Sequence, residues 1–369
     1  MTTITREGLF AVCSTVLLAA LFILNITTGS VDIPAGNILN IIFGNGDKET
    51  WTYIIMESRL PQAITATLCG ASLAVCGLML QTAFNNPLAG PSIFGINSGA
   101  SLGVAIVMLL LNGSISTDLL TVSGFAAVIT GAMAGASAVI ALLMACSRIV
   151  TSNVVLLIIG IMIGYLSSAA ISIFNFFASE QGVQSYVIWG MGNFSSVSLQ
   201  HLPIFSSATI LCLVMSLLMI KPLNALLLGE KYAENLGFNT HRVRAMLLLI
   251  TGIQTAVTTA YCGPVAFIGL AVPHITRLFI RTDSTSSLMP CSIISGAIVA
   301  LACNLVCTLP PNGNIIPLNA VTPLVGAPVI IYLVIKRKYF GHWVRQTNIG
   351  NPCLHNHCRK KLLEWCFLH

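Results

Sequence analysis

The residues best suited to hold a metal ion lie at the end of the chain, between positions 339 and 369. Thiol and imidazole groups, which zinc prefers as ligands, recur there among basic residues: Cys353, His355, His357, Cys358, Cys366 and His369. Their spacing matches no regular zinc pattern. We therefore expect residues 339–369 to form a loosely ordered basic tail rather than a metal site.

Groups that could perform catalysis or bind a nucleotide are missing from the sequence. No Gly-x-x-x-x-Gly-Lys-Ser/Thr segment occurs, so the chain has no P-loop to cradle the phosphates of ATP. No combination of Ser, His and Asp, or of Cys and His, stands out for nucleophilic attack. We interpret His274, which follows Pro273, as a partner in a structural hydrogen bond. The chain is predicted to have no catalytic residue and no cofactor, and not to be an enzyme.

Charged residues are too few for a water-soluble protein of this length. The 369 residues are 56% hydrophobic and 8% charged, whereas soluble domains carry about 25% charged residues. Long stretches such as 60–117 and 284–335 contain no charge and are continuously apolar, which predicts helices. The net charge of +6 comes from scattered cations, so we expect no binding of nucleic acid. The sequence predicts an all-α, multi-pass protein in a lipid bilayer.

Ten membrane-spanning helices account for the charge-free stretches. A helix rises about 1.5 Å per residue and needs about 20 residues to cross a hydrocarbon core about 30 Å thick. The predicted spans are residues 8–28, 62–82, 92–112, 119–144, 153–178, 202–220, 245–262, 264–280, 289–309 and 318–335. Ten spans place both termini on one side of the membrane and form one domain, residues 1–338.

The distribution of cations determines the predicted orientation. With both termini in the cytoplasm, all 17 Lys and Arg residues except Lys48 and Arg59 lie on the cytoplasmic side, as the positive-inside rule requires. No Asp or Glu falls inside a predicted span. Because proton-coupled transporters and ion channels typically keep buried acids, this absence weakens an ion-coupled mechanism.

Cations at both ends of the stretch 245–276 require it to cross the membrane twice. Arg244 precedes it and Arg277 follows it, and both can face the cytoplasm only if the chain turns back, at Cys262-Gly263-Pro264. Each leg then has about 16 residues, or about 24 Å. At least one leg must be short, or broken where protein covers the exposed backbone.

Glycines spaced four residues apart predict close contact between helices, because they let another helix approach. These repeats are Gly95, Gly99 and Gly103, then Gly131 and Gly135, then Gly160 and Gly164. They predict a tight bundle and carry no information about a substrate.

The longest charged loop between spans, from Lys221 to Arg244, has the pattern of a short amphipathic helix. Its apolar start is followed by an alternation of Glu230, Lys231 and Glu234 with Tyr232, Ala233 and Leu236. Gly237 can end the helix in a left-handed conformation. A short helix parallel to the membrane suits contact with a partner protein, and an ordinary solvated connector is the alternative.

An ordered set of short motifs runs along the sequence. The motifs are Arg59-Leu60-Pro61, Asn86-Pro87-Leu88-Ala89, residues 95–100, Leu228-Gly229-Glu230, Ala233, Leu236-Gly237, residues 263–270, residues 272–278 and Gly326-Ala327-Pro328. With these motifs in this order, the sequence resembles the FecCD family of ABC-importer permeases. The resemblance runs from about residue 5 to residue 338. It implies a ten-helix, type II ABC importer permease of the bacterial inner membrane that forms a homodimer, with the translocation path between the two copies. Cytoplasmic ABC ATPase subunits and a periplasmic substrate-binding protein would complete the importer.

The resemblance also assigns roles to individual residues at the two membrane surfaces. The residues expected to couple the chain to the ATPase are Gly229, Glu230, Ala233 and Gly237. Arg59 is expected to meet acidic residues of the binding protein, where charged hydrogen bonds would steer docking; a snorkelling arginine is the alternative. The sequence departs from the family at Gln62, where a second Arg is common, and near Cys307-Thr308, where many relatives have an Arg. Docking is therefore expected to depend less on charge, or to use different groups.

Two polar segments are candidates for the transport path. Thr151-Ser152-Asn153 matches a short segment that forms the inner gate in relatives, and an N-cap for the following helix is an alternative that is compatible with it. Gln81, Asn85 and Asn86 are candidate path residues near the inner end of the second span. Hydrogen bonding at a helix end explains these three residues about as well.

The sequence leads to the hypothesis of a permease subunit of an ATP-driven importer. Its cargo would be a metal chelate, with iron–siderophore complexes ranked first, haem second and cobalamin third. A large, rigid chelate needs a wide, mostly neutral chamber, and the uncharged spans suit that cargo. The alternatives are an ion-coupled secondary transporter that works without an ATPase, and a membrane scaffold or receptor that transports nothing.

Overall fold

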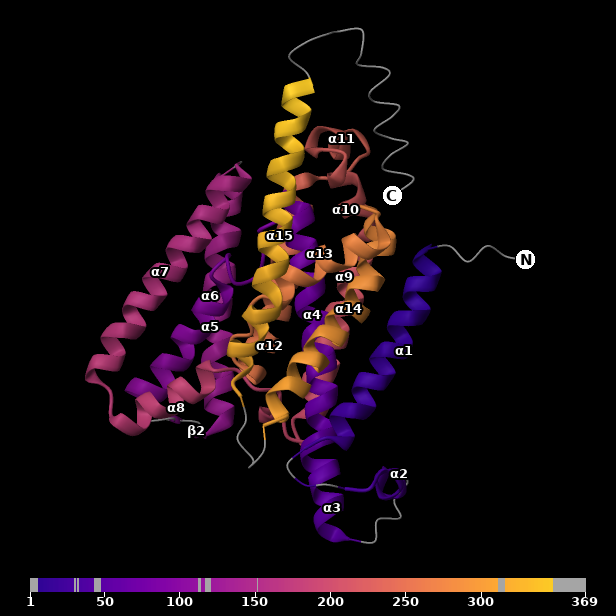
Figure 1. Ribbon diagram of the computed structural model, residues 1–369. Coiled ribbons are helices and arrows are strands. Elements are labelled where there is room, and N and C mark those ends of the chain that lie inside the picture. The colour runs from indigo at the N-terminus through magenta and orange to yellow at the C-terminus, as the bar shows by residue number, and fades with distance from the viewer. Residues whose placement is uncertain are drawn as a thin grey trace. The chain divides into compact units, whose positions relative to one another are not determined.

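The computed structural model describes residues 6–29, 31, 33–42, 48–111, 114–116, 121–150, 152–310 and 316–347. The chain divides into two compact units, Met1–Gly326 and Ala327–His369. The first unit contains the bundle of helices discussed below (Figure 1). The predicted tail, residues 339–369, lies largely outside the described residues, and so do the six Cys and His residues considered above as metal ligands.

The described residues form helices almost throughout. The α-helices are α1 Arg6–Thr27, α2 Ala35–Ile42, α3 Glu49–Tyr53, α4 Leu60–Ala83, α5 Ile96–Ala105, α6 Phe125–Ile149, α7 Asn153–Phe177, α8 Glu180–Gly190, α9 Leu202–Leu218, α10 Ile220–Leu227, α11 Glu230–Asn235, α12 Thr240–Cys262, α13 Ile268–Ile280, α14 Thr285–Thr308 and α15 Leu318–Thr347. Two π-helical segments, η1 Ile54–Arg59 and η2 Ile106–Leu110, and one 3₁₀ turn, η3 Phe194–Ser196, join them. The strands β1 Ser114–Ser116 and β2 Thr121–Ser123 pair antiparallel, with Ile115 opposite Val122.

Apolar helices lie at each of the ten predicted spans. Six are long and apolar enough to cross a membrane on their own: Arg6–Thr27, Glu49–Ala83, Phe125–Ile149, Val154–Phe177, Thr240–Cys262 and Thr285–Thr308. Leu202–Leu218 and Ile220–Leu227 form a pair bent by 46°, and three shorter apolar helices are Ile96–Leu110, Ile268–Ile280 and Leu318–Tyr332. A multi-pass membrane protein is consistent with this set, and the count of ten crossings stays a prediction because the shorter helices do not meet that length on their own.

The fourth predicted span, residues 119–144, is displaced in the structure. Residues 121–123 form β2, Gly124 adopts a positive φ of 63°, and the helix α6 begins only at Phe125 and continues to Ile149. The apolar stretch had been bounded by charge alone. Charge does not reveal that Thr121-Val122-Ser123, with two β-branched residues, favours an extended strand.

The predicted break after Cys262 is confirmed. Gly263 follows α12 with a φ of 75°, and α13 begins at Ile268 after a left-handed Phe267. The two legs are unequal, since α12 has 23 residues and α13 has 13. Helix α12 gains its length by starting at Thr240, so that Arg242 and Arg244 lie inside the helix rather than before it.

Close backbone contact holds the bundle together, as the glycine repeats predict. On α5, a Cβ atom at Gly103 would overlap the carbonyl oxygen of Gly131 on α6, and on α6 a Cβ at Gly135 would overlap that of Gly99. Helix α4 packs in the same way along α14 (Figure 1), where Gly70 and Gly296 face each other. Residues with side chains at these positions would force the helices apart.

A chain of three buried amides joins α1, α14 and α4. Gln62 Nε2 donates to Asn304 Oδ1 at 2.9 Å, and Asn304 Nδ2 donates to Asn25 Oδ1 at 2.7 Å. Asn25 Nδ2 then donates to the carbonyl oxygens of Leu21 and Leu301. A buried amide without a hydrogen-bond partner costs free energy, and each of these three amides finds its partner on another helix. The three helices are therefore tied in one register.

Candidate functional site

The predicted amphipathic helix is the short helix α11, which lies beside α10 at one end of the bundle (Figure 1). Gly229 precedes α11 with a φ of 110°, and Gly237 follows it with a φ of 87°. The nitrogen of Phe238 donates to the carbonyl of Ala233, and the nitrogen of Gly237 donates to that of Glu234. This pair of bonds is a Schellman motif, so the predicted left-handed end at Gly237 is confirmed.

Helix α11 has a buried side and an exposed apolar side. Ala233 is fully buried, whereas Tyr232 and Leu236 are at least half exposed, as is Leu228 just before the helix. Large apolar side chains grouped on a surface commonly mark a site of protein contact. We name the surface of Leu228, Tyr232 and Leu236 the α11 face.

Two polar contacts brace α11 against the start of α12. Arg244 Nη2 donates to Glu230 Oε1 at 2.6 Å; the arginine side chain is 8% exposed and the glutamate 47% exposed. Thr240 Oγ1 donates to Glu234 Oε1 at 2.8 Å. A short, partly buried charged hydrogen bond is stronger than a neutral one. A force on α11 therefore reaches α12 directly.

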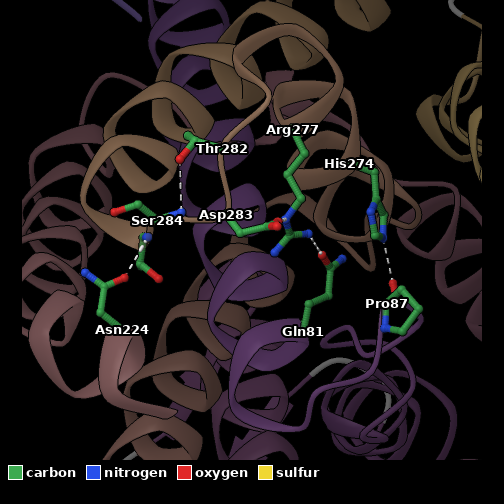
Figure 2. A network of polar contacts seen from close by, with 9 residues as sticks. Gln81, Pro87, Asn224, His274, Arg277, Thr282, Asp283 and Ser284 are labelled. Atoms are coloured by element: carbon green, nitrogen blue, oxygen red, sulfur yellow. Dashed lines mark hydrogen bonds and ion pairs between the residues drawn. The ribbon is translucent and has the colours of Figure 1, made fainter. Parts of the chain in front are cut away.

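A third contact connects the neighbouring helix α10 with α14. Asn224 Oδ1 accepts a hydrogen bond from the backbone nitrogen of Thr285 at 2.8 Å, and Asn224 Nδ2 donates to Ser286 Oγ at 2.9 Å. Figure 2 shows the Asn224 side chain pointing at the loop that leads into α14, beside Ser284. Thus the segment formed by α10 and α11 holds the first turns of both α12 and α14.

The candidate path residue Gln81 holds the short helix α13. Its Oε1 accepts from Arg277 Nη1 at 2.9 Å, its Nε2 donates to the carbonyl of Leu270 at 3.1 Å, and its side chain is buried. In Figure 2 Gln81 faces Arg277, whose Nε lies 3.7 Å from Asp283 Oδ1. The structure thus places Gln81 in a contact between α4 and α13.

The connection after α4 contains the other two path candidates and a contact from His274. Asn85 is exposed and left-handed, with a φ of 44°, and Asn86 Oδ1 accepts from the nitrogen of Leu88 at 2.9 Å. Both residues thus shape a turn after the helix end. His274 Nε2 lies 2.8 Å from the carbonyl oxygen of Pro87 (Figure 2), so the predicted structural hydrogen bond is confirmed.

Arg59 is a buried residue rather than an exposed one. Its side chain is 7% exposed, and its guanidinium donates to the carbonyl oxygens of Ile26, Thr27 and Val31. The last carbonyls of a helix have no partner inside the helix, and a cation there also complements the helix dipole. Arg59 therefore caps the end of α1.

The gate segment is described only in part. Thr151 lies outside the described residues, Ser152 is exposed, and Asn153 is the first residue of α7. Ser152 is extended at the N-cap position without a side-chain capping bond, and its carbonyl accepts from the nitrogen of Leu156 at 3.2 Å. The gate role stays a prediction.

The described residues contain no group of three or more His, Cys, Asp or Glu that could hold a metal ion. A pocket of about 180 Å³ is lined by Gln62 and Cys307, two positions where the sequence departs from the family. The described residues that line it are uncharged and include Asn193 and Asn304. These residues can offer amide and apolar contacts to a partner.

Sequence reasoning missed Arg244, Asn224 and the buried amides. In the sequence, Arg244 is one of several cations in the charged loop, and Asn224 lies in the apolar start of the same loop. A usable signal existed for the amides, since Asn25, Gln62 and Asn304 interrupt otherwise apolar helices. Polar residues inside membrane helices usually face a partner.

Comparison with known proteins gives concordant matches. The model of the FecCD transport family matches residues 17–336. The vitamin B12 import system permease protein BtuC of Pectobacterium atrosepticum is 33% identical over 77% of this chain and 83% of its own length, and that of Klebsiella pneumoniae is 31% identical over 90% and 95%. The hemin transport system permease protein HmuU of Yersinia pestis is 29% identical over 84% and 92%.

A solved structure agrees with these matches. It is an ABC transporter assigned to the metal-chelate type, in an inward-facing conformation, and it aligns with a TM-score of 0.75 at 28% identity, over 88% of this chain and 97% of that one. The family match covers most of the chain, including α4, α11, α13 and α14. The chain belongs to the FecCD transport family and is an ABC-importer permease of that type.

Proposed function

We propose that this permease moves a metal chelate from the periplasm to the cytoplasm, driven by ATP that a separate ABC ATPase hydrolyses. Two copies of the chain form the path between them, and a periplasmic binding protein delivers the cargo. The observation that carries the proposal is the α11 face, an exposed apolar surface on a helix that Glu230 and Arg244 brace rigidly against α12. A rigid, exposed helix can transmit the motion of a partner, whereas a solvated connector would absorb it.

Coupling is assigned to four residues with distinct tasks. Gly229 and Gly237 supply the positive φ values that start and end α11, and Ala233 packs the helix against the bundle. Glu230 links α11 to Arg244. The ATPase would contact the exposed side, and these residues would keep that side in place.

The cargo proposal rests on the family and on the absence of charge. The relatives named above are a vitamin B12 import permease and a hemin transport permease. The described residues that line the pocket near Gln62 are uncharged. A large chelate needs a wide neutral chamber more than it needs tight coordination by the protein. Ferric siderophores, haem and cobalamin all remain in the proposed class.

Transport in proteoliposomes tests the proposal. The tagged chain is purified from its native membranes with its ATPase, reconstituted with the binding protein, and offered radiolabelled cyanocobalamin, hemin or a ferric hydroxamate. We expect uptake of one of these that requires ATP and is insensitive to ionophores. Uptake that persists without the ATPase and collapses with an ion gradient would establish the secondary transporter instead. Purification without any ATPase, and no uptake, would favour the scaffold or receptor.

The homodimer and the gate are tested by cross-linking. If Ser152 lies at an inner gate on the two-fold axis, Ser152→Cys will form an oxidant-dependent dimer on a denaturing gel. The unaltered chain is the control, because it measures any dimer formed through the native cysteines. Cys13, an exposed cysteine on α1, should not link the copies. Equal dimer formation by both chains would remove the gate assignment.

A further inference from the structure

Helix α14 begins without a cap from its own N-cap residue. Ser284, in the N-cap position, makes no side-chain capping bond. An acceptor at a helix start normally comes from this residue and satisfies one of the free backbone N–H groups. Here the acceptor for Thr285 is Asn224, which lies 61 residues earlier in the chain, on another helix.

Helix α10, which carries Asn224, is firmly seated. Leu223 and Ala225, on either side of Asn224, are buried. Helix α10 continues through Leu228 and Gly229 into α11. Asn224 therefore contacts α14 from the segment that leads directly into the α11 face.

Helix α14 in turn is tied closely to α4 and α1. Gly70 and Gly296 bring the backbones of α4 and α14 into contact, which leaves no side chain between them to slide. Asn304 of α14 is hydrogen-bonded to Gln62 of α4 and to Asn25 of α1. Interiors packed in this way transmit displacement instead of absorbing it.

We propose that Asn224 is a positioning residue that links the coupling segment to α14, so that a displacement of α11 moves the unit of α14, α4 and α1. The link acts in parallel with the contact between Glu230 and Arg244, which addresses α12. This inference rests on the proposed function, and it adds a second route by which force enters the bundle. The link is local and polar, so it can be cut without touching the α11 face.

The test uses the whole importer in proteoliposomes and measures ATP hydrolysis and uptake of the transported probe in the same sample. The probe is cyanocobalamin, hemin or a ferric hydroxamate, whichever the unaltered complex takes up. Asn224→Leu removes both hydrogen bonds at similar size. We expect uptake per ATP to fall about fivefold, which corresponds to the loss of a cap of about 1 kcal/mol, while ATP hydrolysis stays within about twofold.

Two matched variants isolate the link. Asn224→Asp keeps the acceptor for Thr285, and its charge suits a helix start, so uptake per ATP should stay within about twofold. Thr282→Val removes a local bond, because Thr282 Oγ1 accepts from the nitrogen of Ser284 at 3.2 Å (Figure 2). That bond does not reach α10, so the ratio should be unchanged.

Two results would overturn the inference. One is an unchanged uptake per ATP in Asn224→Leu, which includes a parallel fall of hydrolysis and uptake, and the other is an equal fall of uptake per ATP in Thr282→Val. Hydrogen exchange of the first-turn amides of α14 provides a readout that needs no transport. We expect faster exchange in Asn224→Leu and not in Asn224→Asp, and equal exchange in both would refute the bond. If the unaltered complex shows no ATP-dependent uptake, the proposed function itself fails, and the inference falls with it.

Discussion

Replacement of Asn304 by leucine tests whether the amide chain holds the helices in register. Asn304 is 5% exposed and uses both halves of its amide, accepting from Gln62 at 2.9 Å and donating to Asn25 at 2.7 Å. Leucine has the same branching and the same number of non-hydrogen atoms, and it makes neither bond. The variant therefore removes two contacts between helices and keeps the branched shape of the side chain.

The expected cost follows from the number of bonds. A hydrogen bond between membrane helices contributes about 0.6 kcal/mol on average and about 1.7 kcal/mol at most. Two bonds give about 1.2 to 3.4 kcal/mol for Asn304→Leu. Gln62→Leu breaks one of these two side-chain bonds and should cost about half as much. The double variant should cost little more than Asn304→Leu, since the bond to Gln62 is lost in both.

The assay is unfolding of the purified chain in mixed micelles by titration with sodium dodecyl sulfate, followed by circular dichroism. Thr67→Val is the matched control, because Thr67 lies on α4 and its Oγ1 bonds only the carbonyl of Ala63 on the same helix at 2.8 Å. We expect that control to change the free energy of unfolding by less than about 0.5 kcal/mol. If the costs of Asn304→Leu and Gln62→Leu simply add in the double variant, the two amides do not interact and the reasoning is wrong.

Three further predictions concern close contacts and charges. Gly77→Ala should lower the free energy of unfolding by about 3 kcal/mol or more, because a Cβ there would overlap a backbone carbonyl of α13. The yield of folded protein in size-exclusion chromatography should fall with it. Gly190→Ala is the control, since a Cβ there has nothing within 4 Å, and its yield should be unchanged. Glu230→Arg should slow ATP-driven uptake at least about tenfold with normal membrane insertion, since Arg244 would then face a cation. Adding Arg244→Glu to this variant should restore part of the uptake. Normal uptake by Glu230→Arg alone would remove the coupling assignment. Arg59→Lys should destabilise the chain by about 1–3 kcal/mol in the same unfolding titration, because the guanidinium bonds to the end of α1 are lost. Loss of affinity for the binding protein at unchanged stability would instead support direct docking.

The sequence predicts those features that depend on one residue or on a short repeat. The end of α11 at Gly237 could be read from the sequence, because a left-handed cap needs glycine at one defined position. The break at Gly263 could be read too, since cations on both sides required a turn. Glycine repeats indicated the contact of α5 with α6 because their spacing matches one helix face.

Contacts between distant segments could not be read in this way. Arg59 is expected from the sequence to meet a binding protein, and the sequence does not reveal that its guanidinium bonds carbonyls about thirty residues earlier. The partner of Glu230 could have been any nearby cation, and only the fold selects Arg244. Gln81 was a path candidate by position, and its two bonds to α13 depend on how α13 packs. Residue types limited the candidates, and tertiary packing chose among them.

Helix α12 shows where a change of access can arise in this bundle. At its start Arg244 receives the coupling contact, along its length Gln254 accepts from Cys76 of α4, and further on Thr259 donates to Asn97 of α5 at 3.2 Å. It therefore touches both glycine-packed groups, α4 with α14 and α5 with α6. Within each group the backbones meet and cannot slide. Between α12 and α6 the close contact is made by a side chain instead, with Ile140 against Gly252, so we expect relative motion driven from α11 to occur there first.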